Sequence, residues 1–218
     1  MLNGGQTCIS VERVYVEAPV HDEFVAKVTE KARALRNERP AGPGSSDVGA
    51  ITFPPQVDIV ERHVQDARDK GAQVVVGGAR GHDGQGGYWY QPTVLVGVDH
   101  TMDCMREETF GPTLPIMKVS SVEEAIRLAN DSPYGLTAAV FSRDIKRAKA
   151  VAVQLDCGAV NVNDVISNLT CTTAPMGGWK MSGLGARFGG AEGLRKYCRQ
   201  EAVVAPRTNI GAGGAYYH

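Results

Sequence analysis

Hydrophobic positions along the chain predict alternating helices and strands. Apolar residues recur at three- and four-residue steps in residues 21–36 and 57–67, which is typical of amphipathic helices, and Gly71 is placed to end the second of them. Short runs rich in valine and aromatic residues predict strands at residues 11–16, 73–76 and 88–98.

The order of elements becomes regular in the second half of the chain. Strand, helix, strand, helix and strand are predicted at residues 114–119, 121–129, 137–141, 144–155 and 159–162. Such alternation implies right-handed crossovers between parallel strands. We therefore expect an α/β fold with a largely parallel open sheet flanked by helices, and ligands beyond the carboxyl ends of its strands.

Two glycine-rich stretches need separate interpretation. Residues 77–87 contain six glycines but no helix pattern follows them, so a hairpin-like excursion is favoured over a phosphate-binding loop. Residues 183–189, within the glycine-dense stretch 176–193, resemble a dinucleotide-binding fingerprint. However, one residue too many separates its second and third glycines, and the strand that a Rossmann unit requires does not precede it. In this second stretch we expect Gly177, Gly178, Gly183 and Gly185 to serve tight turns and close backbone approach.

The C-terminal part is predicted to contain less regular structure. Residues 163–175 are expected to form a long loop. A short helix at residues 191–197, a strand at residues 202–205 and a loose tail at residues 208–218 should follow.

Composition and charge remove several classes of function. The 218 residues are 43% hydrophobic and 22% charged, with a formal net charge of −1, so no electrostatic argument favours nucleic acid or an anionic membrane. No apolar run reaches the roughly 20 residues that span a bilayer, and no secretory signal opens the sequence. A cytoplasmic location is expected.

The five cysteines do not form a disulfide or zinc-binding pattern. They are odd in number and widely spaced, with no Cys-x-x-Cys pair, so no metal site is predicted. Cys8 stands out because it follows a glycine-rich turn, where backbone N–H dipoles can favour the reactive thiolate. From the residues alone, Cys8 could equally be a small buried hydrophobic residue.

Three segments in order carry a resemblance to a known family. They are residues 3–8 (NGGQTC), 107–112 (EETFGP) and 175–185 (PMGGWKMSGLG). Together they resemble the NAD(P)-dependent aldehyde dehydrogenase superfamily over its catalytic domain, with bacterial succinate-semialdehyde-dehydrogenase-like members closest in detail. The resemblance implies a catalytic domain at residues 1–207, whose strand at residues 200–207 pairs with another subunit in homo-oligomers.

The resemblance assigns roles to three residues. Cys8 matches the nucleophile that forms a thiohemiacetal and then a thioester with an aldehyde substrate. Glu108 matches the glutamate that hydrogen-bonds the nicotinamide ribose of NAD or NADP, and Phe110 matches the aromatic beside the nicotinamide. Without the resemblance, the pattern around Glu108 would favour a surface charge run with Phe110 in the core.

The resemblance also suggests a substrate pocket. The loop at residues 164–173 matches the border of the aldehyde tunnel and contains no Arg or Lys. The family often has phenylalanine where Met176 stands, so a broader pocket is expected. The residues expected to line the pocket are Val165, Ile166, Thr170, Cys171 and Met176.

The family pattern extends well before residue 3. The sequence contains no counterpart of the cofactor domain, the oxyanion asparagine or the general-base glutamate, so we expect the catalytic part alone, inactive or weakly esterolytic, with a homo-oligomer or the missing N-terminal half as partner. The alternatives are a catalytically dead fragment that serves as an interaction or assembly domain, and a cysteine hydrolase, for which no histidine suggests the base.

Overall fold

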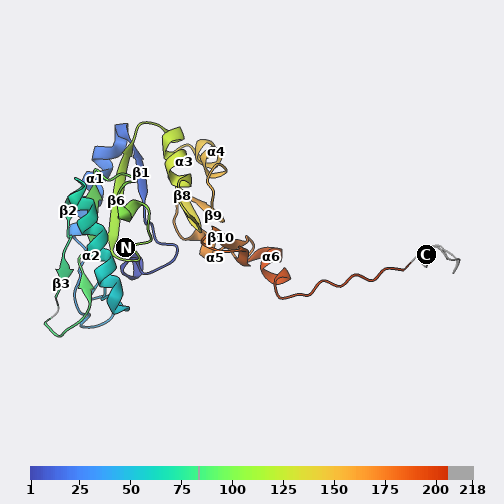
Figure 1. Ribbon diagram of the computed structural model, residues 1–218, viewed down its shortest axis with the longest axis horizontal. Helices are drawn as coiled ribbons and strands as arrows, with labels where there is room; N and C mark the ends of the chain where they lie inside the picture. The colour runs from blue at the N-terminus through green and yellow to red at the C-terminus, as the bar shows by residue number, and fades with distance from the viewer. Residues whose placement is uncertain (83, 206–218) are drawn as a thin grey trace, which may run out of the picture.

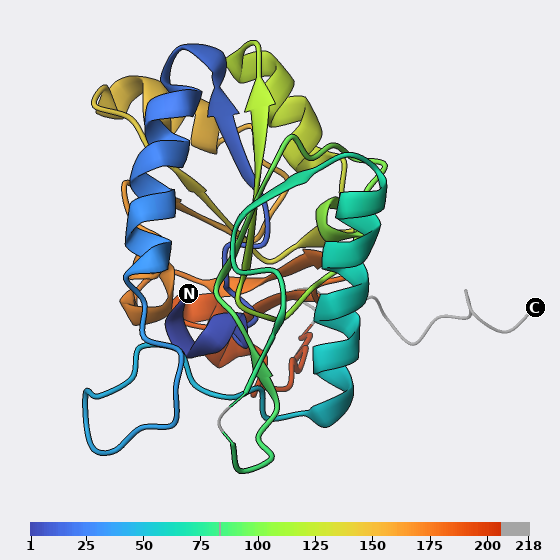
Figure 2. The ribbon, with the colours of Figure 1, turned by 90° about the vertical axis from the view of Figure 1, so that its left-hand side faces the viewer.

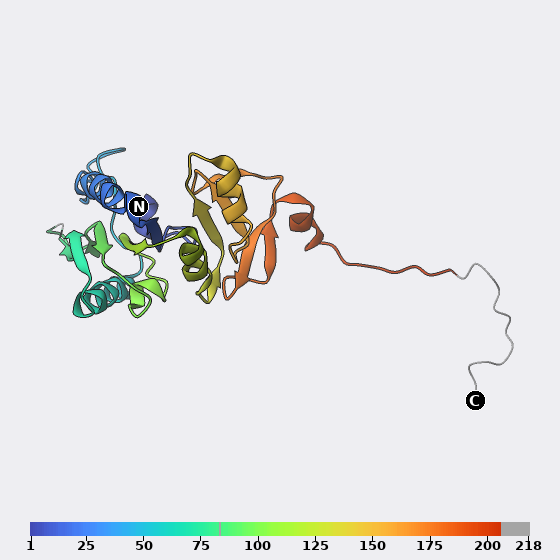
Figure 3. The same ribbon diagram turned by 90° about the horizontal axis from the view of Figure 1, so that it is seen from above.

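The computed structural model describes residues 1–82 and 84–205. Two groups of elements lie side by side (Figures 1 and 3), the first up to about residue 119 and the second after it. No helix in the described part of the chain is long and apolar enough to cross a membrane.

The first group is built around a four-stranded sheet in the order β1-β6-β5-β2. β1 (Val14–Glu17) and β5 (Thr93–Val96) pair in parallel on either side of β6 (Thr113–Val119), and β2 (Gln73–Val76) pairs antiparallel with β5. A parallel neighbour on each side of β6 buries it, which suits its apolar sequence.

Two long helices cover opposite faces of this sheet (Figure 2). α1 (Ala18–Arg33) packs through Ala32 on a cluster that includes Val94 and Ile116. α2 (Pro54–Asp69) packs on a larger cluster that includes Leu95 and Met105. Because neighbouring strand residues face opposite sides, Val94 and Leu95 serve different helices.

The second group consists of short elements. β8 (Thr137–Val140) and β9 (Ala159–Val162) pair in parallel and are covered by α4 (Ile145–Ala152). β10 (Met176–Lys180) pairs antiparallel with both β11 (Gly185–Phe188) and β7 (Tyr134–Gly135). The remaining elements are η1 (Leu2–Gly5), β3 (Arg80–Gly81), β4 (Trp89–Tyr90), η2 (Asp103–Met105), α3 (Val122–Asn130), α5 (Ser167–Thr170) and α6 (Gly190–Arg195).

A polar chain of contacts joins the two groups. The Tyr15 hydroxyl lies 2.9 Å from His100 Nε2, and His100 Nδ1 lies 3.1 Å from an Asp131 carboxylate oxygen. Arg106 donates to the same carboxylate at 2.8 Å. Asp131 follows α3, so these bonds fix the start of the second group against β1.

Several sequence predictions are confirmed. The α/β fold class is correct, Gly71 follows α2 with φ +97°, and residues 77–82 and 84–87 lie in an excursion bounded by the antiparallel pair β3 and β4. The helix expected at residues 121–129 is α3, which Ser121 caps by accepting the Glu124 backbone N–H at 3.2 Å.

Other predictions are wrong in detail. Residues 88–98 form two strands, since Pro92 lacks the N–H that would continue a ladder. The expected loop at 163–175 contains α5, and the glycine-dense stretch contains the β10–β11 hairpin. Residues 202–205 form no strand, because no partner strand accepts their hydrogen bonds in this single chain, while the expected tail at residues 208–218 lies outside the described residues.

Candidate active site

Cys8 lies at the corner of a tight turn directly after η1. The Ser10 N–H donates to the Thr7 carbonyl at 2.8 Å, which places Cys8 at the second position of the turn. Its side chain is exposed. Among the hydrogen bonds of the described residues, none uses the Cys8 N–H, so this donor stays available beside the thiol.

The backbone before Cys8 lies directly against the EETFGP segment. Gly5 has φ +77°, and a Cβ added there would lie 1.9 Å from the Gly111 carbonyl oxygen. Only glycine permits both this conformation and this approach. The first two motifs, far apart in the sequence, are therefore in contact.

The chain after Cys8 contacts the same segment through Glu12. One carboxylate oxygen accepts the Thr109 N–H and the other accepts the Phe110 N–H, each at 3.1 Å. Arg13, the next residue, donates to the Met105 carbonyl at 3.4 Å. The Cys8 turn is thus held against residues 105–111 on both of its sides.

Thr109 is the inward anchor of the EETFGP segment. Its side chain is 1% exposed, and its hydroxyl lies 3.1 Å from His63 Nδ1 on α2. Its carbonyl accepts a hydrogen bond from Gln56 Nε2 at 2.7 Å. Burial lowers the pKa of His63, which favours the neutral ring in this position.

The neighbours of Thr109 are the two residues expected at the nicotinamide. Glu108 is exposed, although nearby protein atoms shield its carboxyl group enough to raise its pKa. Phe110 is half-buried and adopts φ +50°, which is unfavourable for a bulky residue. With Thr109 turned inward, Glu108 and Phe110 are left facing outward.

Burial raises the pKa of Glu12 to about 7. Desolvation is the largest cause, and it outweighs the two backbone N–H groups that favour the charged form. The Glu108 charge raises the pKa further and Arg13 lowers it. A carboxyl group that titrates near neutrality therefore lies between the Cys8 turn and Glu108.

The residues expected to line the aldehyde pocket do not share one surface. Val165, Ile166, Thr170 and Cys171 are exposed on and around α5, whereas Met176 is 1% exposed at the start of β10. Cys171 Sγ lies 3.5 Å from the Thr173 hydroxyl, which lowers the pKa of the thiol. The nearby cavity of about 370 Å³ has a largely apolar lining of Leu169, Thr172, Phe188, Gly189, Gly190, Gly193, Leu194 and Tyr197.

The third motif forms the β10–β11 hairpin of the second group. A Cβ on Gly177 would lie 1.8 Å from the Gly185 carbonyl oxygen, so the expected close backbone approach is confirmed there. No hydrogen bond or ion pair of the described residues joins this hairpin to the first two motifs. It is tied instead to β7, where the Gly135 N–H donates to the Ser182 hydroxyl at 3.0 Å.

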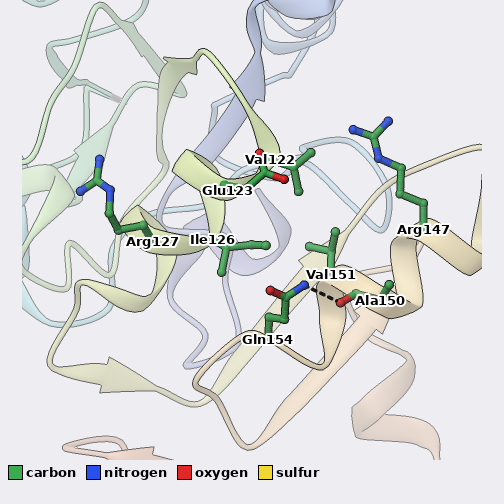
Figure 4. A pocket seen from close by; sticks show the side chains of 8 residues that line it. All are labelled: Val122, Glu123, Ile126, Arg127, Arg147, Ala150, Val151 and Gln154. Carbon is green, nitrogen blue, oxygen red and sulfur yellow. Dashed lines mark hydrogen bonds between the residues drawn. The ribbon is translucent and has the colours of Figure 1, made fainter.

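A second groove lies between α3 and α4 (Figure 4). It holds about 320 Å³, with Arg127 and Arg147 at opposite ends and apolar side chains such as Ile126 between them. It contains no nucleophile, and none of the three motifs lines it. Residues 1–82 and 84–205 contain no group of three or more side chains placed to hold a metal ion.

Sequence reasoning did not single out Glu12, Gln56 or His63. A signal was present for Glu12, since it and Arg13 place two charged side chains in the otherwise apolar run at residues 11–16. Gln56 and His63 lie on a helix whose pattern shows only that α2 is amphipathic. Their partners are 53 and 46 positions away, which local patterns cannot reveal.

Comparison with known proteins decides the family. The model of the aldehyde dehydrogenase family matches residues 1–203. The chain belongs to the aldehyde dehydrogenase family. The resemblance inferred from the three motifs is thereby confirmed, together with the fold class.

Three relatives show how far the similarity to other aldehyde dehydrogenases extends. A Mycolicibacterium smegmatis protein, provisionally named a succinate-semialdehyde dehydrogenase [NADP(+)], is 45% identical over 94% of this chain and 40% of its own length. The 4,4'-diapolycopene aldehyde oxidase of a Methylomonas species is also 45% identical, over 95% of this chain and 38% of its own length. The crystal structure of lactaldehyde dehydrogenase from Escherichia coli matches with a TM-score of 0.85 and 35% sequence identity. The match covers 93% of this chain and 41% of that protein. The chain thus spans about 40% of the length of the curated relatives it matches.

Proposed function

We propose that this chain carries the nucleophile and the nicotinamide-side residues of an enzyme that oxidises an aldehyde to a carboxylic acid with NAD(P)+. The observation that carries the proposal is the direct contact between the Cys8 turn and the EETFGP segment, through Gly5 and Glu12. A reactive thiol and a nicotinamide-binding surface must be adjacent for this chemistry.

In the proposed reaction, the Cys8 thiolate forms a bond to the aldehyde carbon while the carbonyl π electrons move to oxygen, which gives a thiohemiacetal. The free backbone N–H of Cys8 is placed to donate to the developing oxyanion. NAD(P)+, when bound, supplies the acceptor for the hydride that leaves this carbon. Water then cleaves the resulting thioester at its C–S bond, which releases the carboxylic acid and returns the thiol.

The residues on the EETFGP segment fit a nicotinamide riboside. A carboxylate such as that of Glu108 can accept hydrogen bonds from two neighbouring hydroxyl groups of a ribose. Phe110 is half-buried and offers part of its ring as an apolar surface beside the nicotinamide. NAD and NADP both contain this riboside, so the fit does not choose between them.

The aldehyde is proposed only as a chemical class. The three relatives carry the names of three different aldehydes, at 35–45% identity. The loop at residues 164–173 has no Arg or Lys, so an anionic aldehyde would need its positive partner elsewhere. A cytoplasmic location and a homo-oligomeric state also stay predictions.

Competitive alkylation of the cysteines tests the role of Cys8. Limiting iodoacetamide near pH 7.5, followed by peptide mapping, should label Cys8 at least several-fold faster than the other exposed thiols, Cys171 and Cys198. Cys8→Ser supplies the matched control, which should leave the labelling of these two unchanged. If Cys8 reacts no faster than Cys171, the assignment of the nucleophile fails.

A purified polypeptide of these 218 residues should show negligible NAD(P)-dependent aldehyde oxidation. Holding the reacting groups in place is worth about 7–11 kcal/mol in favourable cases, and a polypeptide that spans about 40% of its relatives' length is not expected to supply all of that positioning by itself. Residual hydrolysis of an activated ester would still depend on Cys8. Clear NAD(P)H production, followed at 340 nm, would contradict this expectation.

An interaction or assembly module is the second candidate function. Large apolar side chains exposed in the second group favour it, among them Met181, Leu184 and Tyr197. The ester assay separates the two candidates, because a module without chemistry should show no loss of ester hydrolysis on Cys8→Ser.

A further inference from the structure

We infer that Glu12 is the positioning residue that fixes the Glu108–Phe110 turn against the Cys8 turn, so that Glu108 and Phe110 stay aimed at the ribose and the ring of a nicotinamide riboside. The inference rests on the proposed function for its ligand. Its structural content, an anchored turn, is independent of that ligand and can be tested separately.

The geometry requires an acceptor with two oxygens at this position. Consecutive N–H groups, those of Thr109 and Phe110, each point to a different oxygen of the same carboxylate at 3.1 Å. Glu12 lies only four positions after Cys8, and the intervening turn is closed by the bond from Ser10 to Thr7. A displacement of the Glu12 carboxylate would therefore change the distance between the nucleophile and the EETFGP segment.

The anchored turn contains a conformation that needs support. Phe110 has φ +50°, and non-glycine residues with positive φ persist only where surrounding contacts hold them. The bond from the Phe110 N–H to Glu12 acts directly on this residue. Without it, Phe110 is free to relax toward negative φ, which would redirect both its own ring and the preceding Glu108.

The other contacts of Thr109 do not replace the Glu12 carboxylate as an anchor of the turn. Gln56 and His63 hold the Thr109 carbonyl and hydroxyl, but neither contacts a backbone N–H of the turn. Gly5 limits the approach of Gly111 from the other side by backbone contact alone. Glu12 is thus the residue that links the Cys8 segment to the turn by hydrogen bonds.

Amide hydrogen exchange on the full 218-residue chain tests the inference. Glu12→Gln keeps the volume but retains a single acceptor oxygen, so exchange at Thr109 and Phe110 should accelerate about tenfold at pH 8, and more in Glu12→Ala. Glu30→Gln, an exposed carboxylate on α1, is the matched control and should leave both amides unchanged. Unchanged protection of Thr109 and Phe110 in Glu12→Gln would overturn the inference.

Two further measurements separate an anchoring role from general destabilisation and from the proposed function. Global stability at pH 8 should not fall in Glu12→Gln, although the two amides lose protection; a uniform loss over all core amides would overturn the inference. If the variant does not fold, the same amides are followed in the unmodified chain, where their protection should fall as pH drops through about 7 while that of Val94 persists. Unchanged protection across that range would also overturn it.

Nicotinamide mononucleotide serves as the ligand probe because it contains the nicotinamide and its ribose without the adenosine half. At millimolar concentration it should shift the amide resonances of Glu108 and Phe110 in the unmodified chain, and less so in Glu12→Gln. No shift in the unmodified chain would count against the nicotinamide assignment of these residues. The exchange result at Thr109 and Phe110 would still decide the anchoring role of Glu12.

Discussion

Glu12 experiences two opposed effects. Two backbone N–H groups favour its charged form, while desolvation disfavours that form more strongly and raises the pKa from 4.5 to about 7. The folded protein therefore binds the Glu12 proton more tightly than the unfolded chain does. The stability associated with this proton is fully present below about pH 4.5 and is lost as the pH rises through 7.

The free energy of unfolding should reveal this titration. A pKa difference of this size corresponds to about 3 kcal/mol. Between pH 4 and 8, the stability of Glu12→Gln relative to the unmodified chain should increase by up to about this amount, because glutamine does not titrate. Urea unfolding at both pH values measures the difference, and a difference that does not change with pH would contradict the prediction.

At the residue scale, the sequence could predict candidate site residues only where they lie in a recognisable motif. Cys8, Glu108 and Phe110 lie in motifs that can be recognised without a structure, although their roles stay predictions. Glu12 contacts residues 97 and 98 positions away, and nothing in its local pattern names those partners. Side chains that hold a site in place through long-range contacts are therefore the part that sequence reasoning misses.

Among the elements, the β10–β11 hairpin depends on close approach between two backbones. Gly177 is buried, and the space its Cβ would need is occupied by the Gly185 carbonyl. No flexible side chain is there to move aside. Any larger residue must displace one strand from the other.

Gly177→Ala should therefore destabilise the chain by about 2–3 kcal/mol, as overpacking of a close backbone contact does. Gly42→Ala is the matched control, because a Cβ there meets nothing within 4 Å, and it should change stability by less than about 0.5 kcal/mol. Thermal unfolding of both variants compares them directly. Equal transition temperatures would show that the hairpin tolerates a Cβ at this position.

Element boundaries were predicted well where local chemistry sets them. Asp144 caps α4 by accepting two backbone N–H bonds, from Lys146 and Arg147, and the helix was expected to begin there. β1 begins later than the apolar run at residues 11–16 suggested, because Glu12 and Arg13 bond to residues 105–110 and not to a neighbouring strand. Tertiary contacts outweighed strand propensity at that point.

Over the whole molecule, exposed apolar side chains concentrate in the second group and the segment that leaves it. Val203 and Val204 are each 87% exposed, and Figure 1 shows their segment extending away from the rest of the chain. Other exposed large apolar side chains in this region include Trp179, Met181, Leu184, Leu194 and Tyr197. Large apolar side chains exposed in this number favour association.

The purified chain should consequently self-associate and bind a hydrophobic dye. Light scattering at increasing concentration should give a mass above 23.2 kDa, and the double variant Val203→Lys, Val204→Lys should reduce it. Lysine side chains in this exposed segment oppose association of like segments through charge repulsion. A monomer at all concentrations, without dye binding, would contradict the expectation.

The arrangement of the strands shows the limit of prediction at this scale. Alternating helices and strands correctly indicated parallel pairs, such as β1 with β6 and β8 with β9. They did not indicate that the described strands divide among four separate sheets. The handedness rule for parallel strands fixes the hand of each crossover, but which strands become neighbours depends on long-range packing.

The bonds from Glu12 to Thr109 and Phe110 also bear on when the site forms during folding. They close loops of 97 and 98 residues, and closing such loops costs chain entropy before the hydrogen bonds can stabilise the contact. The Cys8 turn and its partner turn are about a hundred residues apart along the chain. The two turns therefore come together only when β6 pairs with β1.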